Sequence, residues 1–262
     1  MNLRNAIIVT TFMCFTSLAH AGTELPAFSP EQEQAIGNIA AAYLIDHPEI
    51  LVQVSQSLQK KQAERQRERF SAAAVKYRAL LLASGDTPSV GPDGARVAVV
   101  EFFDYQCIYC SRTAPVVERV MTSNPGVRFI FKEWPIFADR WAISRTAAVR
   151  GLQVWKQKGA AGYLQYHNGL FQTGHYEGAL TADDIAKASQ GAGFDDKQAI
   201  SEDAALGMLQ DTNILAQALG LSGTPALVVM PIAGAHTENT TVIPGAATAE
   251  ALQHAIDLAS RP

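Results

Sequence analysis

The sequence predicts an α/β domain whose sheet contains strands of mixed direction. Four apolar runs typical of strands lie at 97–103, 127–131, 226–230 and 241–243. The region from Trp141 to Leu219 has helical periodicity throughout and separates the second run from the third. A strand–helix–strand unit, a helical insertion, two strands and a final helix follow one another, which is an order typical of α/β folds.

The size and composition of the chain suit one such domain with an accessory segment. It has 262 residues, of which 48% are hydrophobic and 18% are charged, so it can bury a substantial core. The formal net charge of −4 argues against nucleic acid as a main partner.

The N-terminus has the pattern of a secretory signal peptide. A short positive region at 1–5 precedes an apolar stretch from Ala6 to Leu18. Ala19-His20-Ala21 has the small-x-small pattern of a cleavage site, so we expect a signal peptide over residues 1–21. A membrane anchor is a weaker alternative, because the stretch is shorter than the roughly 20 residues of a bilayer span. A lipoprotein anchored through Cys14 is weaker still, since no small residue precedes this cysteine.

Two amphipathic helices are expected after the signal peptide. Ser29, Pro30 and Gln32 form a capping-box pattern at the first helix start, and the segment from Asp46 to Glu49 has the same pattern for a second start. Both helices then present apolar residues at helical spacing, namely Ile36, Ile39, Ala40, Tyr43 and Leu44 in the first and Ile50, Leu51, Val54 and Leu58 in the second.

The second helix continues into a strongly charged stretch from Gln59 to Arg69. A helix that is polar all round often spans solvent between packed bodies, which favours self-association of the apolar stripes with copies of the same segment. Packing of the stripes on the chain's own α/β domain is the alternative, and the charged stretch by itself is also compatible with an ordinary solvated helix face. The heptads are too few to predict the number of subunits.

Turn residues mark the entry to the α/β domain, at 84–88 and again at 91–94. We therefore expect an oligomerisation stalk over 22–86 and an α/β domain over 87–262, with the helical insertion at about 139–219. Within the insertion, glycines near 159–162, 174 and 191–193 break the helical pattern, and Thr181 caps one helix. A last helix is expected from about Thr248 to Ala259.

Cys107 and Cys110 lie where the strand at 97–103 gives way to a helix that is expected from Ser111. The first turn of a helix offers unpaired N–H groups and the positive end of its dipole, and both favour a thiolate. We expect Cys107 at the exposed helix tip and Cys110 one turn later, close enough to form a disulfide. A low-pKa cysteine with a resolving neighbour is the equipment of thiol–disulfide exchange.

Other roles for the CxxC pair are weaker. A zinc site needs further ligands, and His167 and His175 are better explained as packed or solvated residues. A structural disulfide across so short a loop would hardly stabilise the fold. Signal cleavage would remove Cys14 and leave only the reactive pair, which suits an oxidising compartment such as the bacterial periplasm. We expect no cofactor and no resident metal.

Three segments, at 101–110, 131–136 and 219–225, resemble the DsbA family of thioredoxin-fold proteins with a helical insertion. The N-terminal helices resemble those of its oligomeric subgroup typified by ScsC, BcfH and Com1-like proteins, in which such helices bring catalytic domains together. The resemblance implies a thiol–disulfide oxidoreductase with a thioredoxin fold. It also implies client proteins that carry thiols or disulfides, and a membrane redox partner.

The resemblance also assigns site residues. Cys107 matches the nucleophile, Cys110 the resolving cysteine, and Pro225 the cis-proline that leaves the preceding backbone free to pair with a substrate strand. An ordinary trans turn is the alternative for the Thr224–Pro225 bond. Thr224 is expected beside the sulfurs, and Glu101 matches a buried acid that could relay the Cys110 proton. The alternative for Glu101 is a carboxylate facing water, and Lys132 is a weaker suggestion for its partner.

The dipeptide between the cysteines, Ile108-Tyr109, departs from strongly oxidising DsbA proteins because it contains neither proline nor histidine. A cationic histidine there would stabilise the thiolate, so its absence predicts a less oxidising pair. Tyr109 and Thr224 instead resemble the usage in disulfide isomerases. We therefore expect an exported isomerase that also introduces disulfides. The alternatives are an oxidase kept oxidised by a membrane partner, and a thiol protein that handles a soft metal ion such as Cu(I).

Overall fold

The computed structural model describes residues 28–83 and 85–261. These residues fall into two compact units that divide between Leu58 and Gln59. The signal peptide expected over residues 1–21, with its cleavage site, lies outside the described residues. Within the described ranges, no helix is both long enough and apolar enough to cross a bilayer.

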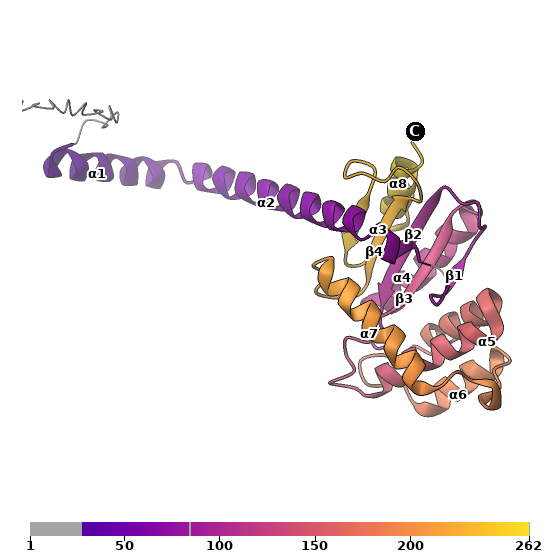
Figure 1. The fold of residues 1–262 in the computed structure, drawn as a ribbon. Coiled ribbons are helices and arrows are strands. Elements are labelled where there is room, and N and C mark those ends of the chain that lie inside the picture. The colour runs from indigo at the N-terminus through magenta and orange to yellow at the C-terminus, as the bar shows by residue number, and fades with distance from the viewer. Residues whose placement is uncertain (1–27, 84, 262) are drawn as a thin grey trace, which may run out of the picture. The chain divides into compact units, whose positions relative to one another are not determined.

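The first unit contains α1 (Pro30–Asp46) and the start of α2 (Glu49–Lys76), as Figure 1 shows. The first expected capping box is confirmed, because the Gln32 backbone N–H donates to the Ser29 hydroxyl and the Ser29 N–H donates to the Gln32 side chain over 2.9 Å. The second one is wrong. Asp46 is the last residue of α1, and a residue in helical conformation cannot adopt the extended geometry of an N-cap for α2.

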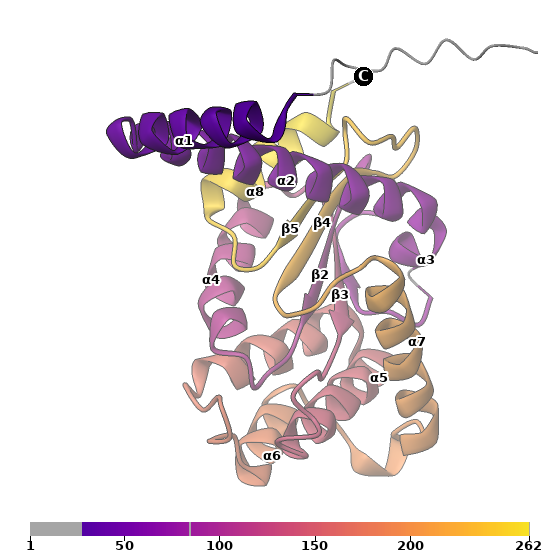
Figure 2. The same cartoon turned by 90° about the vertical axis from the view of Figure 1, so that its left-hand side faces the viewer.

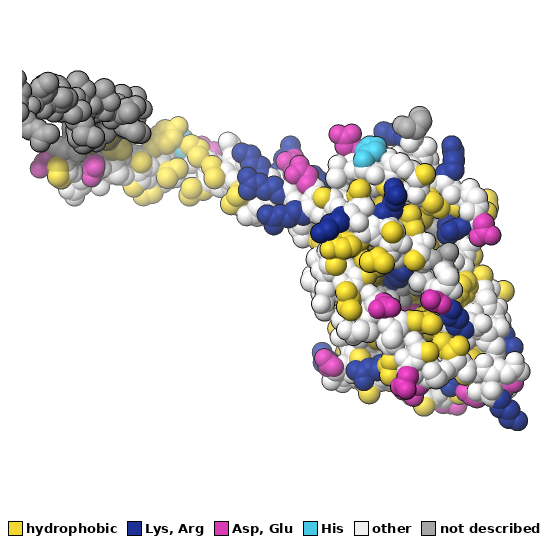
Figure 3. Space-filling view, in the orientation of Figure 1, with side chains coloured by type: hydrophobic (Ala, Val, Ile, Leu, Met, Phe, Trp, Pro, Cys, Tyr) yellow, Lys and Arg dark blue, Asp and Glu magenta, His cyan; other side chains and the backbone are white. Residues whose placement is uncertain are grey.

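The apolar side chains of the first unit are exposed. α1 contains no buried residue, and Ile39 and Ile45 are 69% and 77% exposed. Leu51 and Leu58, in the first turns of α2, are exposed as well. Figure 3 shows hydrophobic side chains at the surface of this unit. Contiguous exposed apolar side chains are typical of an interaction surface.

The second unit is built on a five-stranded sheet with the order β1-β3-β2-β4-β5. β2 and β3 are parallel, and the other neighbouring pairs are antiparallel, so the predicted mixed direction is confirmed. The two-residue strand β1 was not expected from the sequence, because it lies between two clusters of turn residues. The strands are β1 (Ser89–Val90), β2 (Val97–Phe103), β3 (Arg128–Glu133), β4 (Ala226–Pro231) and β5 (Thr241–Pro244).

Helices cover both faces of this sheet (Figure 2). Side chains alternate between the faces along a strand. Val99 and Phe103 of β2 therefore pack with α4 (Ile108–Ser123), α5 (Ile143–Gln172) and α8 (Ala249–Ala259) on one face. Phe102, from the same strand, packs on the other face with the end of α2, with α3 (Arg78–Leu82) and with α7 (Glu202–Ala218). Every residue of β2 is buried, which explains its continuous apolar sequence.

The α/β unit begins before the boundary expected between residues 86 and 87. Phe70 and Ala74 of α2 and Leu81 of α3 (Arg78–Leu82) are buried in the core on the second face of the sheet. The sequence gives little sign of this boundary. After the charged stretch of α2, only one side of the helix becomes apolar. The compact unit accordingly starts at Gln59.

The helical insertion lies between β3 and β4. It consists of α5 (Ile143–Gln172), α6 (Ala182–Gly191), a short 3₁₀ helix at Asp196–Gln198, and α7 (Glu202–Ala218). Gly159 interrupts α5 with φ 64° and ψ −157°, at one of the expected glycine breaks. The Thr181 cap of α6 is confirmed, and Asp184 completes its capping box.

Candidate active site

Cys107 is the N-cap residue of α4, directly after the turn that follows β2. The helix begins at Ile108, three residues earlier than Ser111, where it was expected. Cys110 therefore lies in the first helical turn. Both cysteines are free thiols. The arrangement places Cys107 at the end of the helix where unpaired N–H groups and the helix dipole favour a negative sulfur.

The expectation of an exposed sulfur at the helix tip is wrong, because Cys107 is only 3% exposed. The loop before β4 lies against it, and the Cys107 thiol donates to the carbonyl oxygen of Thr224 over 3.2 Å. The exposed residue of the motif is Tyr109, which is 56% exposed and lies near the guanidinium of Arg112, 5.7 Å from its ring centroid.

The pKa values of the two thiols are shifted in opposite directions. Hydrogen bonding from the Cys110 side chain is the main cause that lowers the pKa of Cys107 to about 6, and Thr224 and backbone N–H groups add to it against the effect of burial. Burial is the main cause that raises the pKa of Cys110 well above its usual value, and the neighbouring Cys107 adds to it. At neutral pH the arrangement therefore favours a thiolate at Cys107 and a thiol at Cys110.

The Thr224–Pro225 peptide bond is cis, in agreement with the expectation for this turn. It immediately precedes β4, which pairs with the strand leading to Cys107. The Thr224 Oγ1 atom is buried and makes no hydrogen bond in the structure. Its hydroxyl is therefore free to turn toward the Cys107 sulfur, whose pKa it helps to lower. A free hydroxyl and a backbone carbonyl thus lie beside Cys107.

Glu101 lies in the middle of β2, between Phe131 of β3 and Leu227 of β4 in the sheet register. It is 2% exposed, so the alternative of a carboxylate facing water is wrong. Burial raises its pKa to about 8, and its Oε2 atom makes no hydrogen bond. By the alternation of the strand, its side chain is on the α4 face of the sheet, with Val99 and Phe103.

The structure does not support Lys132 as the partner of Glu101. Lys132 is the register neighbour of Phe102, and side chains of neighbouring strands that are aligned in register share one face. Its ammonium group therefore lies on the other face, where Nζ donates to the Leu80 carbonyl over 3.2 Å and to the Thr87 hydroxyl over 3.1 Å.

A second buried acid on the α4 face was missed. The hydroxyls of Tyr105 and Tyr163 each donate to Glu133 Oε1 over 2.9 Å, while burial raises the pKa of Glu133 well above its usual value. The sequence pattern ended this strand at Phe131, whereas β3 continues to Glu133. A strand extended by two residues would have revealed an acid on the same face as Glu101.

The two histidines considered as ligands have other roles. His167 is buried among aromatic rings, including Phe103 at 4.7 Å between centroids, and burial lowers its pKa to about 3. His175 lies with Nδ1 2.9 Å from Asp184 Oδ2, so it belongs to a polar network at the start of α6. In the part of the chain that the structure describes, no group of three or more His, Cys, Asp or Glu residues is arranged to hold a metal ion.

Two known families match this chain, one over its N-terminal helices and one over its α/β domain. Residues 98–257 match the DSBA-like thioredoxin domain, and residues 32–65 match the N-terminal domain described as that of the copper resistance protein ScsC. A separate match of 46 residues, at 35% identity, joins the chain to the Na(+)/H(+) antiporter NhaA 1 of Salinispora arenicola. The chain spans only 7% of the length of that antiporter, so this likeness carries no argument about function.

Solved structures show the same relationship. BcfH of Salmonella enterica Typhimurium is 44% identical with a TM-score of 0.77, and the match covers 87% of this chain and 96% of that one. ScsC of Proteus mirabilis, in a transitional conformation, is 27% identical with a TM-score of 0.60, over 90% and 99% of the two chains. The thiol-disulfide exchange protein alpha-DsbA2 of Wolbachia pipientis, 20% identical with a TM-score of 0.61 over 72% and 94%, shares the fold. The chain therefore belongs to the DsbA-like thioredoxin family of thiol–disulfide oxidoreductases, and its N-terminal segment is of the ScsC type.

Proposed function

We propose that this protein is an exported thiol–disulfide isomerase that also introduces disulfides into periplasmic clients. The observation that carries this proposal is that the two thiols have pKa values shifted in opposite directions. The pKa of Cys107 is lowered to about 6, and burial raises the pKa of Cys110. One thiol is prepared to attack, and the other stays protonated until a mixed disulfide has formed.

In the isomerase cycle, the Cys107 thiolate attacks one sulfur of a client disulfide. A Cys107–client disulfide forms, and the other client sulfur leaves as a thiolate. A different client thiolate then attacks the client sulfur of this mixed disulfide, which forms the rearranged client disulfide and releases the Cys107 thiolate. No net electrons are transferred, so the cycle requires no external oxidant or reductant.

Cys110 provides an exit when rearrangement fails. Its thiol loses a proton, its sulfur attacks Cys107, and the client leaves as a thiolate while a Cys107–Cys110 disulfide forms. We propose Glu101, whose side chain is on the α4 face, as the relay of this proton. Its pKa of about 8 leaves part of the population ionised near neutral pH, and that carboxylate form accepts the proton and later releases it to solvent. A dithiol reductant at the membrane would return the disulfide to the active dithiol, because the client has gained two electrons.

Self-association would place several such sites around one client. It is supported by the exposed apolar side chains of α1 and early α2, among them Ile39 and Leu51, and by the match to the ScsC N-terminal domain. The client chain would lie against the Thr224–Pro225 loop, where a carbonyl and a free hydroxyl are next to the sulfur.

Recovery of activity from scrambled ribonuclease tests the proposal. We expect the chain from residue 22 to restore ribonuclease activity much faster than a chain that begins at Gln59, when the two are compared at the same concentration of active thiol. The second chain retains the compact unit, so circular dichroism and melting should show an intact fold. Equal isomerase rates for the two chains would remove the role of self-association, and a lack of activity in both would contradict the isomerase.

An oxidase is the second candidate, and one observation favours it. A thiolate that is stabilised in the reduced protein makes the corresponding disulfide more oxidising, and the pKa of Cys107 is lowered to about 6. The redox state of Cys107 and Cys110 in the living cell discriminates between the two. An isomerase is kept mainly as the dithiol and an oxidase mainly as the disulfide.

A further inference from the structure

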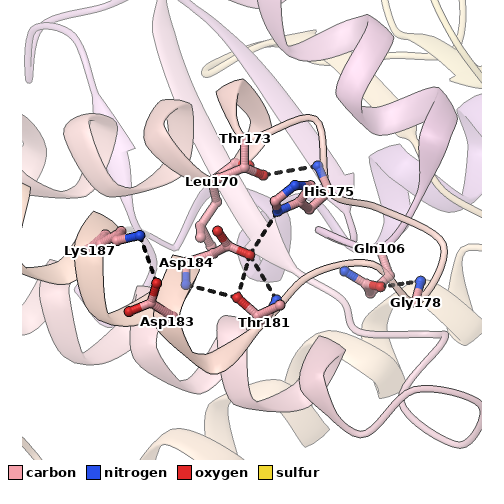
Figure 4. A network of polar contacts seen from close by, with 9 residues as sticks. All are labelled: Gln106, Leu170, Thr173, His175, Gly178, Thr181, Asp183, Asp184 and Lys187. Atoms are coloured by element: carbon pink, nitrogen blue, oxygen red, sulfur yellow. Dashed lines mark hydrogen bonds and ion pairs between the residues drawn. The ribbon is translucent and has the colours of Figure 1, made fainter.

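Gln106, the residue directly before Cys107, is attached to a distant loop through both its backbone and its side chain. The N–H of Glu177 donates to the Gln106 backbone carbonyl over 3.0 Å. The N–H of Gly178 donates to the Gln106 Oε1 atom over 2.6 Å, as Figure 4 shows. Gln106 is completely buried. Two successive N–H groups of the loop between α5 and α6 are thus committed to the residue next to the nucleophile.

The loop adopts an unusual conformation in order to make these bonds. Glu177 has a φ of 55°, which is rare for a residue with a side chain, and Gly178 has a φ of 97°. A Cβ atom at Gly178 would lie 2.6 Å from Trp141 Nε1, so no larger residue fits without a shift. Rare backbone conformations persist where surrounding contacts determine them, and they occur often at functional sites.

The other end of the same loop is anchored at the start of α6. Asp184 Oδ2 accepts from the Thr181 backbone N–H over 2.9 Å and from the Thr181 hydroxyl over 2.6 Å, and it lies 2.9 Å from His175 Nδ1 (Figure 4). The Thr173 hydroxyl accepts from the His175 N–H over 3.1 Å. A loop held in this way provides a fixed support for Gln106.

On the other side, Gln106 belongs to the tight turn that sets the position of Cys107. Its N–H donates to Asp104 Oδ1 over 2.7 Å, and the Cys107 N–H donates to the Asp104 carbonyl over 3.0 Å. The Cys107 sulfur depends on correct distances to Cys110 and Thr224 for its reactivity. We propose that Gln106 is a positioning residue, through which the α5–α6 loop of the helical insertion holds the nucleophilic sulfur in its reactive geometry.

This inference rests on the proposed thiol–disulfide chemistry, and the test uses Gln106→Met in the full mature chain. Methionine preserves the volume and removes the acceptor for Gly178. It also removes the Gln106 Nε2 group, which is buried without a partner, so folding is expected to persist. The matched control is Gln157→Met. The Gln157 side chain also accepts from a loop N–H, that of Asp195, over 2.8 Å, and it donates to the Asp195 carbonyl over 2.8 Å, but it lies far from the cysteines in sequence.

Thiolate absorbance against pH and the equilibrium with glutathione are measured for each protein. We expect Gln106→Met to lower the acid dissociation constant of Cys107 about threefold, a pKa increase of about half a unit, because fewer molecules keep the sulfur beside its donors. Gln157→Met should leave both values unchanged. Gly178→Ala, which displaces the loop and leaves Gln106 intact, should reproduce the effect of Gln106→Met.

Wild-type values for both Gln106→Met and Gly178→Ala would overturn the inference. An equal change in Gln157→Met would do the same, because it would indicate general loosening of the domain. If the unaltered protein fails to exchange with glutathione, the proposed function is contradicted, while the Cys107 pKa values still test the positioning role by themselves.

Discussion

The Cys107 sulfur lies 3.2 Å from the carbonyl oxygen of Thr224, a residue 117 positions further along the chain. This contact joins the start of α4 to the loop before β4, and it accounts for the burial of the sulfur. We expect a client disulfide to approach along the Thr224–Pro225 loop, because this loop lies against the sulfur. If this expectation holds, the same loop sets both the position of the client strand and the reactivity of the sulfur.

The two cysteines are expected to differ sharply when each is replaced by serine. Cys107→Ser should abolish both isomerase activity and reaction with clients, because the buried Cys110 thiol keeps a raised pKa and cannot substitute for it. Cys110→Ser should still attack clients and accumulate mixed disulfides. Non-reducing gels followed by mass spectrometry of the trapped species provide the measurement, and mixed disulfides that persist in Cys107→Ser would contradict this assignment.

Alkylation of Cys107 should depend on pH with a midpoint near 6, because its pKa is lowered to about 6 and only the thiolate reacts. The lowered pKa of Cys107 also makes the stability of the reduced protein depend on pH. A thiol whose pKa is lowered in the folded state stabilises the reduced protein at high pH, and this contribution is lost as the pH falls toward 6. Cys107→Ser should therefore lose less stability than the wild type between pH 9 and pH 6 in urea denaturation. A midpoint near the usual thiol value of about 8.5 would contradict the prediction.

Glu101→Gln should slow the release of clients without changing the first attack. The carboxylate that accepts the Cys110 proton is lost, so decay of the Cys107–client disulfide slows, while alkylation of Cys107 remains normal. The substitution should also increase stability. A carboxyl whose pKa is raised to about 8 in the folded state destabilises that state increasingly as the pH rises above the pKa that the carboxyl has in the unfolded chain. The gain is on the order of 3 kcal/mol at pH 7 and should disappear below about pH 4. Stopped-flow release and denaturation at the two pH values measure these effects.

Phe70→Ala should destabilise the α/β unit by about 3 kcal/mol, because Phe70 is buried in the core on the second face of the sheet. Lys60→Ala, at an exposed position earlier in the same helix, should change stability little and serves as the control. For the same reason, a chain that begins at Thr87 should melt at a lower temperature than one that begins at Gln59. Equal melting temperatures for these two chains would show that the end of α2 is dispensable.

Much of the fold could be predicted from the sequence, because strongly patterned segments report their own environment. The continuous apolar run at 97–103 corresponds to β2 without error, and the caps at Ser29 and Thr181 occur where the residues predicted them. These features depend on local periodicity and on side-chain bonds to nearby backbone. The capping box expected at Asp46 is absent because Asp46 belongs to the last turn of α1 and cannot also be the N-cap of the next helix.

The sequence by itself determined the α/β class, the CxxC pair at a strand-to-helix junction and the apolar stripes of the N-terminal helices, since each is encoded within a short stretch of chain. Only the tertiary structure decided that Cys107 is buried, that Lys132 lies on the face away from Glu101, and that Glu133 is a second buried acid. These properties arise from strand register and from contacts between segments distant in sequence. Burial and pKa depend on what surrounds a side chain in space, and no local pattern contains that information.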